Sequence, residues 1–241
     1  MMLKKILVKK ILVTFFIGLF VNNILGQKVI QKSVGTNNKT QRPLSANSNP
    51  KEQLKNAVLK SQKSQSISVK VELIVQNKQF VTAFEYLAPN RYSLFETTSG
   101  IAVKEAVEIS RQRFQKKDNQ WVKTRKDYFL LREQLDLYFP IKFTSLKSDI
   151  IKIKEVKVTY LGEDFSGEKK YSKYQYTISY KGFDNIDSGV AWVNQTTKFL
   201  EKLETENFGL FGATKALFNY HYDKEIKIEE PKNFIVKDWI N

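Results

Sequence analysis

Residues 67–75 read Ile-Ser-Val-Lys-Val-Glu-Leu-Ile-Val, and this stretch decides the fold. Every odd position from Ile67 to Val75 is apolar, and Ser68, Lys70 and Glu72 lie between them. Successive side chains of a strand point to opposite faces, so this period of two predicts a strand with one buried face. Residues 80–87 form a second predicted strand after a polar turn at 76–78, which indicates an antiparallel hairpin.

Short strands separated by turns continue along most of the chain. We expect them at 91–97, 101–110, 112–116, 120–123, 150–160, 174–180, 189–194, 199–206, 214–222 and 224–229. The apolar phase slips within 150–160, which predicts a β-bulge near Lys154-Glu155. Close spacing of strands indicates an antiparallel meander, and a sheet of this length tends to curl. The predicted fold class is therefore α+β: one curved antiparallel half-barrel of about ten or eleven strands, with short helices plugging its concave face.

Two helices are predicted to cover that face. The first begins at Asn49, which can cap it, continues with Pro50 and Glu52 at capping-box spacing, and ends near Ser64. The second spans 127–139 and places Tyr128, Leu131, Leu135 and Tyr138 on one side before Pro140 ends it. Because the second helix interrupts the run of strands, we expect it to act as a lid or plug over the sheet.

The first 26 residues have the charge and apolar pattern of a secretory signal peptide. Four lysines precede an apolar core at 11–21, and Gly26 is a small residue behind which a peptidase can cut. We therefore predict a signal peptide at 1–26, cleavage near Gly26, and a mature protein that is periplasmic or secreted. An uncleaved anchor is the alternative, although the core is shorter than the roughly 20 apolar residues of a spanning helix.

Residues 27–48 are polar, which predicts a disordered tether before a folded domain at 49–231 and a C-terminal tail at 232–241. The net charge of the whole chain is +15, and removal of the leader's four lysines leaves +11. Outside the cytoplasm, this excess favours an anionic membrane surface as partner rather than nucleic acid. The alternative explanation is a lysine-rich composition of the kind that an AT-rich genome produces.

The chain offers little material for catalysis. It has no cysteine, which excludes disulfides, thiolate metal sites and cysteine nucleophiles. His221 is the only histidine and lies in a strand pattern, so neither a catalytic triad nor a metal cluster can be assembled around it. Glu201, Glu204 and Glu206 belong to a lysine-interleaved strand and indicate a solvated face. We expect no catalytic residues, metal or cofactor, and a hydrolase with a hidden carboxylate pair is the weakest alternative.

Aromatic residues make up 13% of the chain, and many fall at alternating strand positions. A curled sheet lined by such side chains can enclose a ligand cavity, although packing in an ordinary core is the alternative for each residue. The residues expected to line the cavity are Val71, Leu73, Ala83, Phe84, Tyr86, Tyr92, Leu94, Trp121, Tyr128, Leu131, Leu135, Tyr174, Tyr176, Trp192, Phe218 and Tyr220. Phe208, Leu210 and Phe211 form a glycine-flanked loop that we expect either to act as a flap at the cavity mouth or to pack into the core.

Three pieces of sequence carry a family resemblance: Phe84-Glu-Tyr-Leu-Ala-Pro-Asn-Arg-Tyr92, Gln120-Trp-Val-Lys123 and Val190-Ala-Trp-Val-Asn-Gln-Thr-Thr-Lys-Phe-Leu-Glu201. With the export signal, the short helix and the long alternating strand, they resemble the LolA-like superfamily of periplasmic lipoprotein carriers, including the mycobacterial LppX/LprG-type lipid-binding domains. The resemblance covers residues 49–231 and implies a half-barrel with a hydrophobic cavity for acyl chains. It also implies that Arg91 holds a closed state through hydrogen bonds to helix-loop carbonyls, unless it is an ordinary surface arginine. The chain departs from the pattern in its missing lipobox cysteine and its high positive charge, which leaves the cargo open.

Two functions from different classes follow. The first is an exported bacterial envelope protein that binds a lipid or lipoprotein acyl chain in a hydrophobic cavity, as a carrier or chaperone. The second is a non-enzymatic sensor or interaction module of the same fold, which acts on a membrane-protein partner through its surface. Lipid that co-purifies with the protein would favour the first, whereas a cavity filled by the protein's own side chains would favour the second.

Overall fold

The computed structural model describes residues 49–75, 78–124, 135, 137–145, 151–183, 186–206, 215–222 and 225–236. The predicted signal peptide and tether, Tyr128, Leu131 and the loop that contains Phe208, Leu210 and Phe211 lie outside these residues. Within them the chain forms one α-helix, α2 (Pro50–Gln62), and twelve strands. No helix of this described part is long and apolar enough to cross a membrane.

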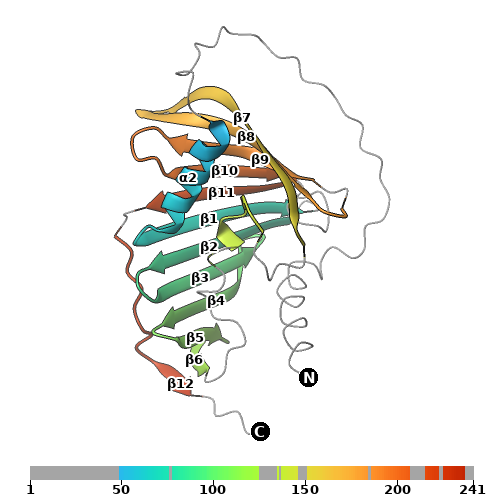
Figure 1. The fold of residues 1–241 in the computed structure, drawn as a ribbon. Helices are drawn as coiled ribbons and strands as arrows, with labels where there is room; N and C mark the ends of the chain where they lie inside the picture. Colours follow the sequence, from blue (N-terminus) through green and yellow to red (C-terminus); the bar gives the residue numbers. More distant parts are fainter. Residues whose placement is uncertain are drawn as a thin grey trace.

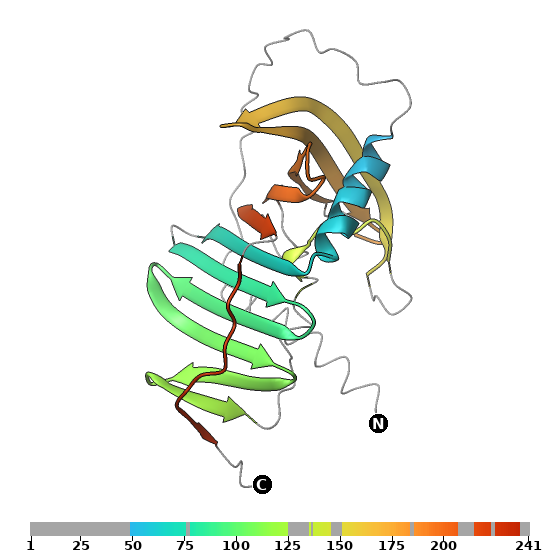
Figure 2. The ribbon, with the colours of Figure 1, turned by 90° about the vertical axis from the view of Figure 1, so that its left-hand side faces the viewer.

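The strands are β1 (Ser66–Val75), β2 (Lys78–Leu87), β3 (Arg91–Thr98), β4 (Ile101–Ile109), β5 (Gln112–Lys117), β6 (Gln120–Thr124), β7 (Ile153–Ser166), β8 (Lys169–Tyr180), β9 (Ile186–Asn194), β10 (Leu200–Glu206), β11 (Lys215–Tyr222) and β12 (Phe234–Val236). They form one open sheet in the order β12-β6-β5-β4-β3-β2-β1-β11-β10-β9-β8-β7 (Figure 1). All neighbours are antiparallel except β12, which runs parallel to β6. The sheet-dominated, mostly antiparallel class is confirmed, and Figure 2 shows β7 and β8 curving toward α2.

Local features of the sheet follow the sequence pattern. The β7–β8 ladder shifts register between Ile153 and Glu155, which confirms the bulge predicted at that position. The predicted hairpin of β5 and β6 turns at Asp118 and Asn119, whose φ angles of 50° and 60° are those of a two-residue hairpin turn. His221 is exposed on the sheet surface, as its strand pattern predicts.

The C-terminal segment differs from its prediction. Residues 225–229, which are most of the strand predicted at 224–229, are not part of the sheet. With residues 230–233 they form an extended strap across one end of the strands (Figure 2). Ile226 and Ile228 are buried and the residues between and beside them are exposed, so packing against the sheet produces an alternation that resembles a strand's. Residues 234–236, which fall within the predicted tail, form β12 and pair with β6.

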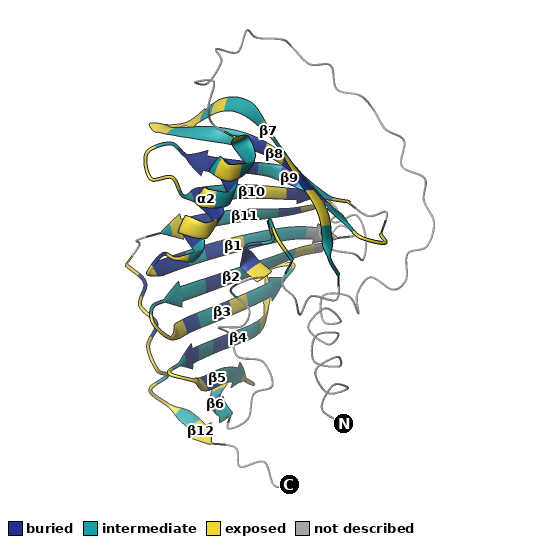
Figure 3. Cartoon of the chain, viewed as in Figure 1, coloured by how far each residue is buried: buried dark blue, intermediate teal, exposed yellow. Residues whose placement is uncertain are grey.

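The register separates two faces of the sheet. The helix face packs against α2 and carries Ile67, Val69, Val71 and Leu73 of β1 with their ladder partners on β2 and β11. The outer face carries the intervening residues of β1, such as Lys70 and Glu72. Buried and exposed residues accordingly alternate along the strands (Figure 3). Of the two strand ends, the left end contains the turns at 88–90 and 195–199, and the right end contains the turn at 99–100 (Figure 1).

Helix α2 begins at its predicted cap. The Asn49 side chain accepts a hydrogen bond from the backbone N–H of Lys51 at 3.0 Å, whereas the Glu52 carboxylate pairs with Lys55. Leu54, Ala57 and Val58 are buried against the sheet. Two polar bonds also tie the helix to strands: Tyr174 OH donates to Gln53 at 2.8 Å, and Ser61 Oγ accepts from the backbone N–H of Leu200 at 2.9 Å.

The second predicted helix, 127–139, is not confirmed. Residues 127–134 and 136 lie outside the described part of the chain, and Leu135 and Leu137–Tyr138 have 3₁₀ geometry. Tyr138 and the next residue, Phe139, are 9% and 1% exposed. Both side chains of this consecutive pair pack against the helix face, and a helix would turn one of them about 100° away from the other. The packing of two rings therefore sets the path of this segment.

Candidate functional site

A short segment lies across the middle of the helix face and fills it with aromatic rings. We call Leu135 and residues 137–143 the plug. The ring of Tyr138 stacks on Phe84 of β2, with 4.3 Å between centroids and 17° between planes. The ring of Phe139 stacks on Tyr220 of β11 at 5.1 Å and 20°. Two consecutive plug residues therefore bridge strands that flank β1 on either side.

A buried hydrogen bond holds the plug on the sheet. The hydroxyl of Tyr220 donates to the backbone carbonyl of Tyr138 at 2.8 Å, and Tyr220 is 1% exposed. Burial raises the pKa of both phenols above the ordinary value, and the nearby Glu96 carboxylate raises the pKa of Tyr138 further. Both hydroxyls therefore stay protonated at physiological pH, so Tyr220 keeps the proton that it donates to the plug.

More aromatic rings flank the plug, and their hydroxyls are used in bonds. Phe218, Tyr220 and Tyr222 stack along β11 with 6.2 and 6.3 Å between successive centroids. Tyr222 OH donates to the Leu200 carbonyl at 2.6 Å. The face is thus apolar in the body of its rings and hydrogen-bonded at their polar tips, as expected for buried tyrosines.

Most of the predicted cavity residues come together on this face. Those placed there by the ladder register and the core packing are Val71, Leu73, Phe84, Tyr86, Tyr92, Leu94, Tyr174, Tyr176, Phe218 and Tyr220. Leu135 lies in the plug and packs against the same cluster. That these residues line a cavity stays a prediction, because the rings of the plug occupy the middle of the face.

Three predicted cavity residues, Ala83, Trp121 and Trp192, lie on the outer face instead, so their placement in the cavity was wrong. Ala83 pairs with Lys70 and therefore points away from its neighbour Phe84. Trp121 is opposite Lys116 in the ladder, and the lysine ammonium lies 5.9 Å from the ring centroid. An aromatic side chain predicts burial, but it does not reveal which face of a sheet buries it.

Trp192 shows how the outer face buries an indole. The ring lies 5.0 Å from the ammonium of Lys173 and 4.3 Å from that of Lys202, and the residue is 7% exposed. Its Nε1 donates to Asp164 at 2.7 Å, and this hydrogen bond holds the pKa of that carboxyl below its ordinary value. The two lysines are its ladder neighbours on β8 and β10. The sequence alone does not show that these residues are neighbours, because it does not give the pairing of the strands.

Arg91 binds a carbonyl, but not one in a helix loop. Its guanidinium Nη1 donates to the backbone oxygen of Ile228 at 2.7 Å. Ile228 belongs to the strap, so Arg91 fastens the segment that leads to β12 against the left end of the sheet.

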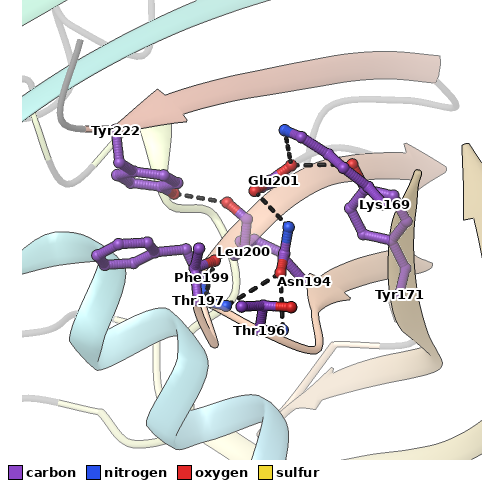
Figure 4. Close-up of polar contacts among 9 residues, drawn as sticks. All are labelled: Lys169, Tyr171, Asn194, Thr196, Thr197, Phe199, Leu200, Glu201 and Tyr222. Atoms are coloured by element: carbon purple, nitrogen blue, oxygen red, sulfur yellow. Dashed lines mark hydrogen bonds and ion pairs between the residues drawn. The ribbon is translucent and has the colours of Figure 1, made fainter. Parts of the chain in front are cut away.

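A polar cluster supports the β9–β10 turn (Figure 4). Glu201, expected on a solvated face, has a side chain only 15% exposed and accepts bonds from Lys169 at 2.8 Å and Tyr171 at 2.9 Å. Asn194 donates to the same carboxylate at 2.9 Å and accepts from the backbone N–H groups of Thr196 and Thr197 at 2.8 and 3.0 Å. Burial and the bond to Glu201 raise the pKa of Tyr171 to about 12. The cluster therefore fixes the turn rigidly.

Two hollows open at the left end of the sheet. The larger, of about 550 Å³, lies between the C-terminal half of α2 and Phe199, and the smaller, of about 300 Å³, lies beside Tyr92 and Glu108 at the turn at 88–90. Neither reaches the middle of the helix face, where the plug is stacked.

Toward the right end, the helix face becomes accessible. Ile67 and Val69 of β1 are fully buried, whereas Val71 and Leu73 are half-buried. Ile101, which shares this face at the start of β4, is 72% exposed. Apolar surface continuous with the core is therefore open at this end.

Comparison with known proteins finds similarity in structure but not in sequence. No family model matches the chain, and no curated protein matches it. The Mycobacterium tuberculosis lipoprotein LppX is similar with a TM-score of 0.51 and 12% identity, over 74% of this chain and 97% of that one. LprF from Mycobacterium bovis has a TM-score of 0.49 and 10% identity, over 76% and 96%. A DUF1329 family protein from Desulfovibrio piger has a TM-score of 0.27 and 9% identity, over 74% and 95%. The chain therefore has the fold of the lipoprotein LppX, which confirms the LppX-type resemblance at the level of the fold.

Proposed function

We propose that this protein is exported to the bacterial envelope, where it binds a lipid or lipoprotein acyl chain on the helix face and serves as a carrier or chaperone. The observation that carries the proposal is an aromatic face continuous with accessible apolar surface and covered in its middle by a short stacked plug. An acyl chain that replaces the plug contributes about 0.8 kcal/mol for each methylene it buries. The LppX fold and the leader-like residues 1–26 support the same function.

Loading requires the plug to move. Tyr138 and Phe139 occupy the surface that the chain of a lipid would contact, and their stacking on Phe84 and Tyr220 is the interaction to be exchanged. Such an exchange replaces one apolar contact by another, so the cost of exposing the two rings offsets part of the free energy that the acyl chain gains by leaving water. The closed structure is then the unloaded state of the carrier.

The test uses two tryptophan substitutions in adjacent strands. Val71→Trp enlarges a half-buried residue of the helix face, and Ala83→Trp enlarges a half-buried residue of the outer face. The wild-type protein, purified from its own envelope, should carry lipid in native mass spectrometry. Val71→Trp should lose most of that lipid, whereas Ala83→Trp should keep it, and circular dichroism should show that both variants are folded.

Equal loading of both variants would remove the helix face as the binding site. Absence of lipid from the wild type would favour the second function, an interaction module that acts on a membrane-protein partner. The structure offers one observation for that alternative, because the middle of the helix face is filled by the protein's own rings. Capture of a membrane protein that does not depend on added lipid would then be the expected result.

A further inference from the structure

We infer that the groove between α2 and the β9–β10 turn is a docking site for the surface of an anionic lipid bilayer. This proposal goes beyond acyl-chain binding, because it concerns the left end of the molecule rather than the helix face. The groove has a volume of about 550 Å³. Leu59, Lys60 and Lys63 form one wall, Phe199 lies opposite, and the polar side chains of Asn56, Ser64 and Gln65 complete it.

The charge of the groove is positive and unbalanced. Among the described residues that line it there are two lysines and no acidic residue. The ammonium of Lys60 is held by neutral groups: it donates to the Thr197 carbonyl at 2.7 Å and lies 4.9 Å from the ring centroid of Phe199. Within the described part of the chain no carboxylate pairs with Lys60 or Lys63. No described carboxylate therefore neutralises either charge, and both can attract anionic headgroups.

The groove is also preformed. Phe199 stacks on Tyr222 (Figure 4), and the ring centroids are 4.4 Å apart with 19° between the ring planes. The backbone N–H of Asn194 donates to the Phe199 carbonyl at 2.9 Å, and the Asn194 side chain accepts from the turn that precedes Phe199. Docking therefore requires little ordering of this wall, which is the main entropic cost of binding at flexible surfaces.

Apolar side chains next to the charges indicate a bilayer rather than a soluble anion. Leu59 is 42% exposed on the outward side of α2. Phe165, in the β7–β8 hairpin at the same left end, is 66% exposed and has the ammonium of Lys170 5.8 Å from its ring centroid. Exposed apolar residues beside lysines match an interface in which headgroups meet acyl chains. The protein's own residues 27–48 are a poor occupant, because they contain four basic residues and no acidic one.

The test measures docking locally, in the full chain. The chain has no cysteine, so a polarity-sensitive fluorophore can be attached through Asn56→Cys at the groove or through Lys157→Cys at the right end. Vesicles of phosphatidylcholine and phosphatidylglycerol in equal parts should shift the Asn56 label toward an apolar environment and leave the Lys157 label unchanged. Vesicles of phosphatidylcholine alone should shift neither label.

The double variant Lys60→Gln/Lys63→Gln should raise the vesicle concentration needed for the shift about 25-fold, at about fivefold for each lysine near an anionic surface. A matched variant, Lys70→Gln/Lys215→Gln, removes the same charge outside the groove and should leave the concentration unchanged. An equal loss in both variants would overturn the proposal in favour of general charge attraction. A full Asn56 response to inorganic phosphate alone would overturn it in favour of a small-anion site. Lipid loading in native mass spectrometry should be unaffected by either variant, so failure of this proposal is distinguishable from failure of the lipid-binding function.

Discussion

Tyr220→Phe tests whether the plug leaves the helix face when lipid binds. The substitution removes one hydroxyl and keeps the ring, so the stacking of Phe139 on residue 220 is preserved. The lost interaction is the bond from Tyr220 OH to the Tyr138 carbonyl, which is 2.8 Å long and buried. It connects the sheet to the plug, and its loss therefore acts on the closed state alone.

The expected magnitude follows from the burial of this bond. A neutral buried hydrogen bond contributes about 1 kcal/mol, and a carbonyl left without a partner adds to the loss, so about 1.4 kcal/mol is a fair value. That energy shifts the equilibrium of plug opening about tenfold toward the open state. Apparent affinity is limited by the fraction of binding-competent molecules, so the apparent Kd for lipid should fall about tenfold. The variant should thus be less stable and yet bind more tightly.

The control is Tyr222→Phe, two residues along the same strand. Its hydroxyl also donates to a buried carbonyl, that of Leu200 at 2.6 Å, but Leu200 belongs to β10 and not to the plug. Urea denaturation should show a similar loss of stability in both variants, and titration with a fluorescent fatty acid should show tighter binding in Tyr220→Phe alone. Unchanged affinity in Tyr220→Phe, or an equal gain in Tyr222→Phe, would refute displacement of the plug.

Three further predictions concern features outside the plug. Arg91→Gln should break the charge-assisted hydrogen bond to the Ile228 carbonyl, which contributes about 1.5 to 3 kcal/mol. Amide hydrogen exchange should then become faster in the strap but not in β1. Gly189→Ala should lower the free energy of unfolding by about 3 kcal/mol in urea denaturation, since an added Cβ would lie 2.1 Å from the Glu204 carbonyl oxygen. Asp164→Asn should make the free energy of unfolding depend less steeply on pH in acid. The pKa of Asp164 in the folded protein lies below its ordinary value of 3.8. The ionised carboxylate therefore stabilises the fold fully above pH 3.8, and this contribution is lost as the pH falls through the pKa of the folded protein.

Each of these has a control in the same chain. Arg91→Lys keeps the charge and a donor, and it should recover part of the protection of the strap. Gly100→Ala introduces a side chain at a φ of +81° with nothing within 4 Å, so it should show backbone strain of about 1 kcal/mol without a clash. Asp118→Asn, in an exposed turn, should keep the acid limb intact. A Gly189→Ala variant no less stable than Gly100→Ala, or identical acid limbs in Asp118→Asn and Asp164→Asn, would contradict the contacts described.

The strands were predictable because their information is local. The period of two from Ile67 to Val75 depends only on neighbouring residues, as does the bulge at Lys154-Glu155. The pairing of β1 with β11 was beyond such patterns, since Ile67 and Tyr222 are far apart in the chain and no local signal connects them. The predicted meander therefore includes the hairpins between consecutive strands, but it does not include the pairing of β1 with β11 at the centre of the sheet.

The residues of the candidate site were predictable only where the alternation of side chains within one strand decides the face. Phe84 and Tyr86 share a face by parity, and the same parity excludes Ala83 from it, so those three residues could not all line one cavity. Trp121 is half-buried beside one lysine and Trp192 is buried between two, and this covering by lysines on neighbouring strands cannot be distinguished in sequence from burial in a core. The strap shows the converse error, in which alternate burial of Ile226 and Ile228 without a ladder resembles a strand.

The groove and the accessible part of the helix face lie at opposite ends of the strands, and this arrangement has a consequence for how lipid would be handled. The accessible apolar surface around Val71 and Leu73 lies toward the right end, whereas the groove at Lys60 and Phe199 lies at the left end. A molecule docked through the groove therefore has its accessible apolar surface at the right end directed away from the bilayer. This orientation suits transfer of lipid to or from another protein rather than direct extraction of lipid. A carrier that extracts lipid directly would instead insert its right end, where Ile101 is 72% exposed. Labels at Asn56 and Lys157 separate these cases, because only the end that enters the bilayer reports an apolar environment.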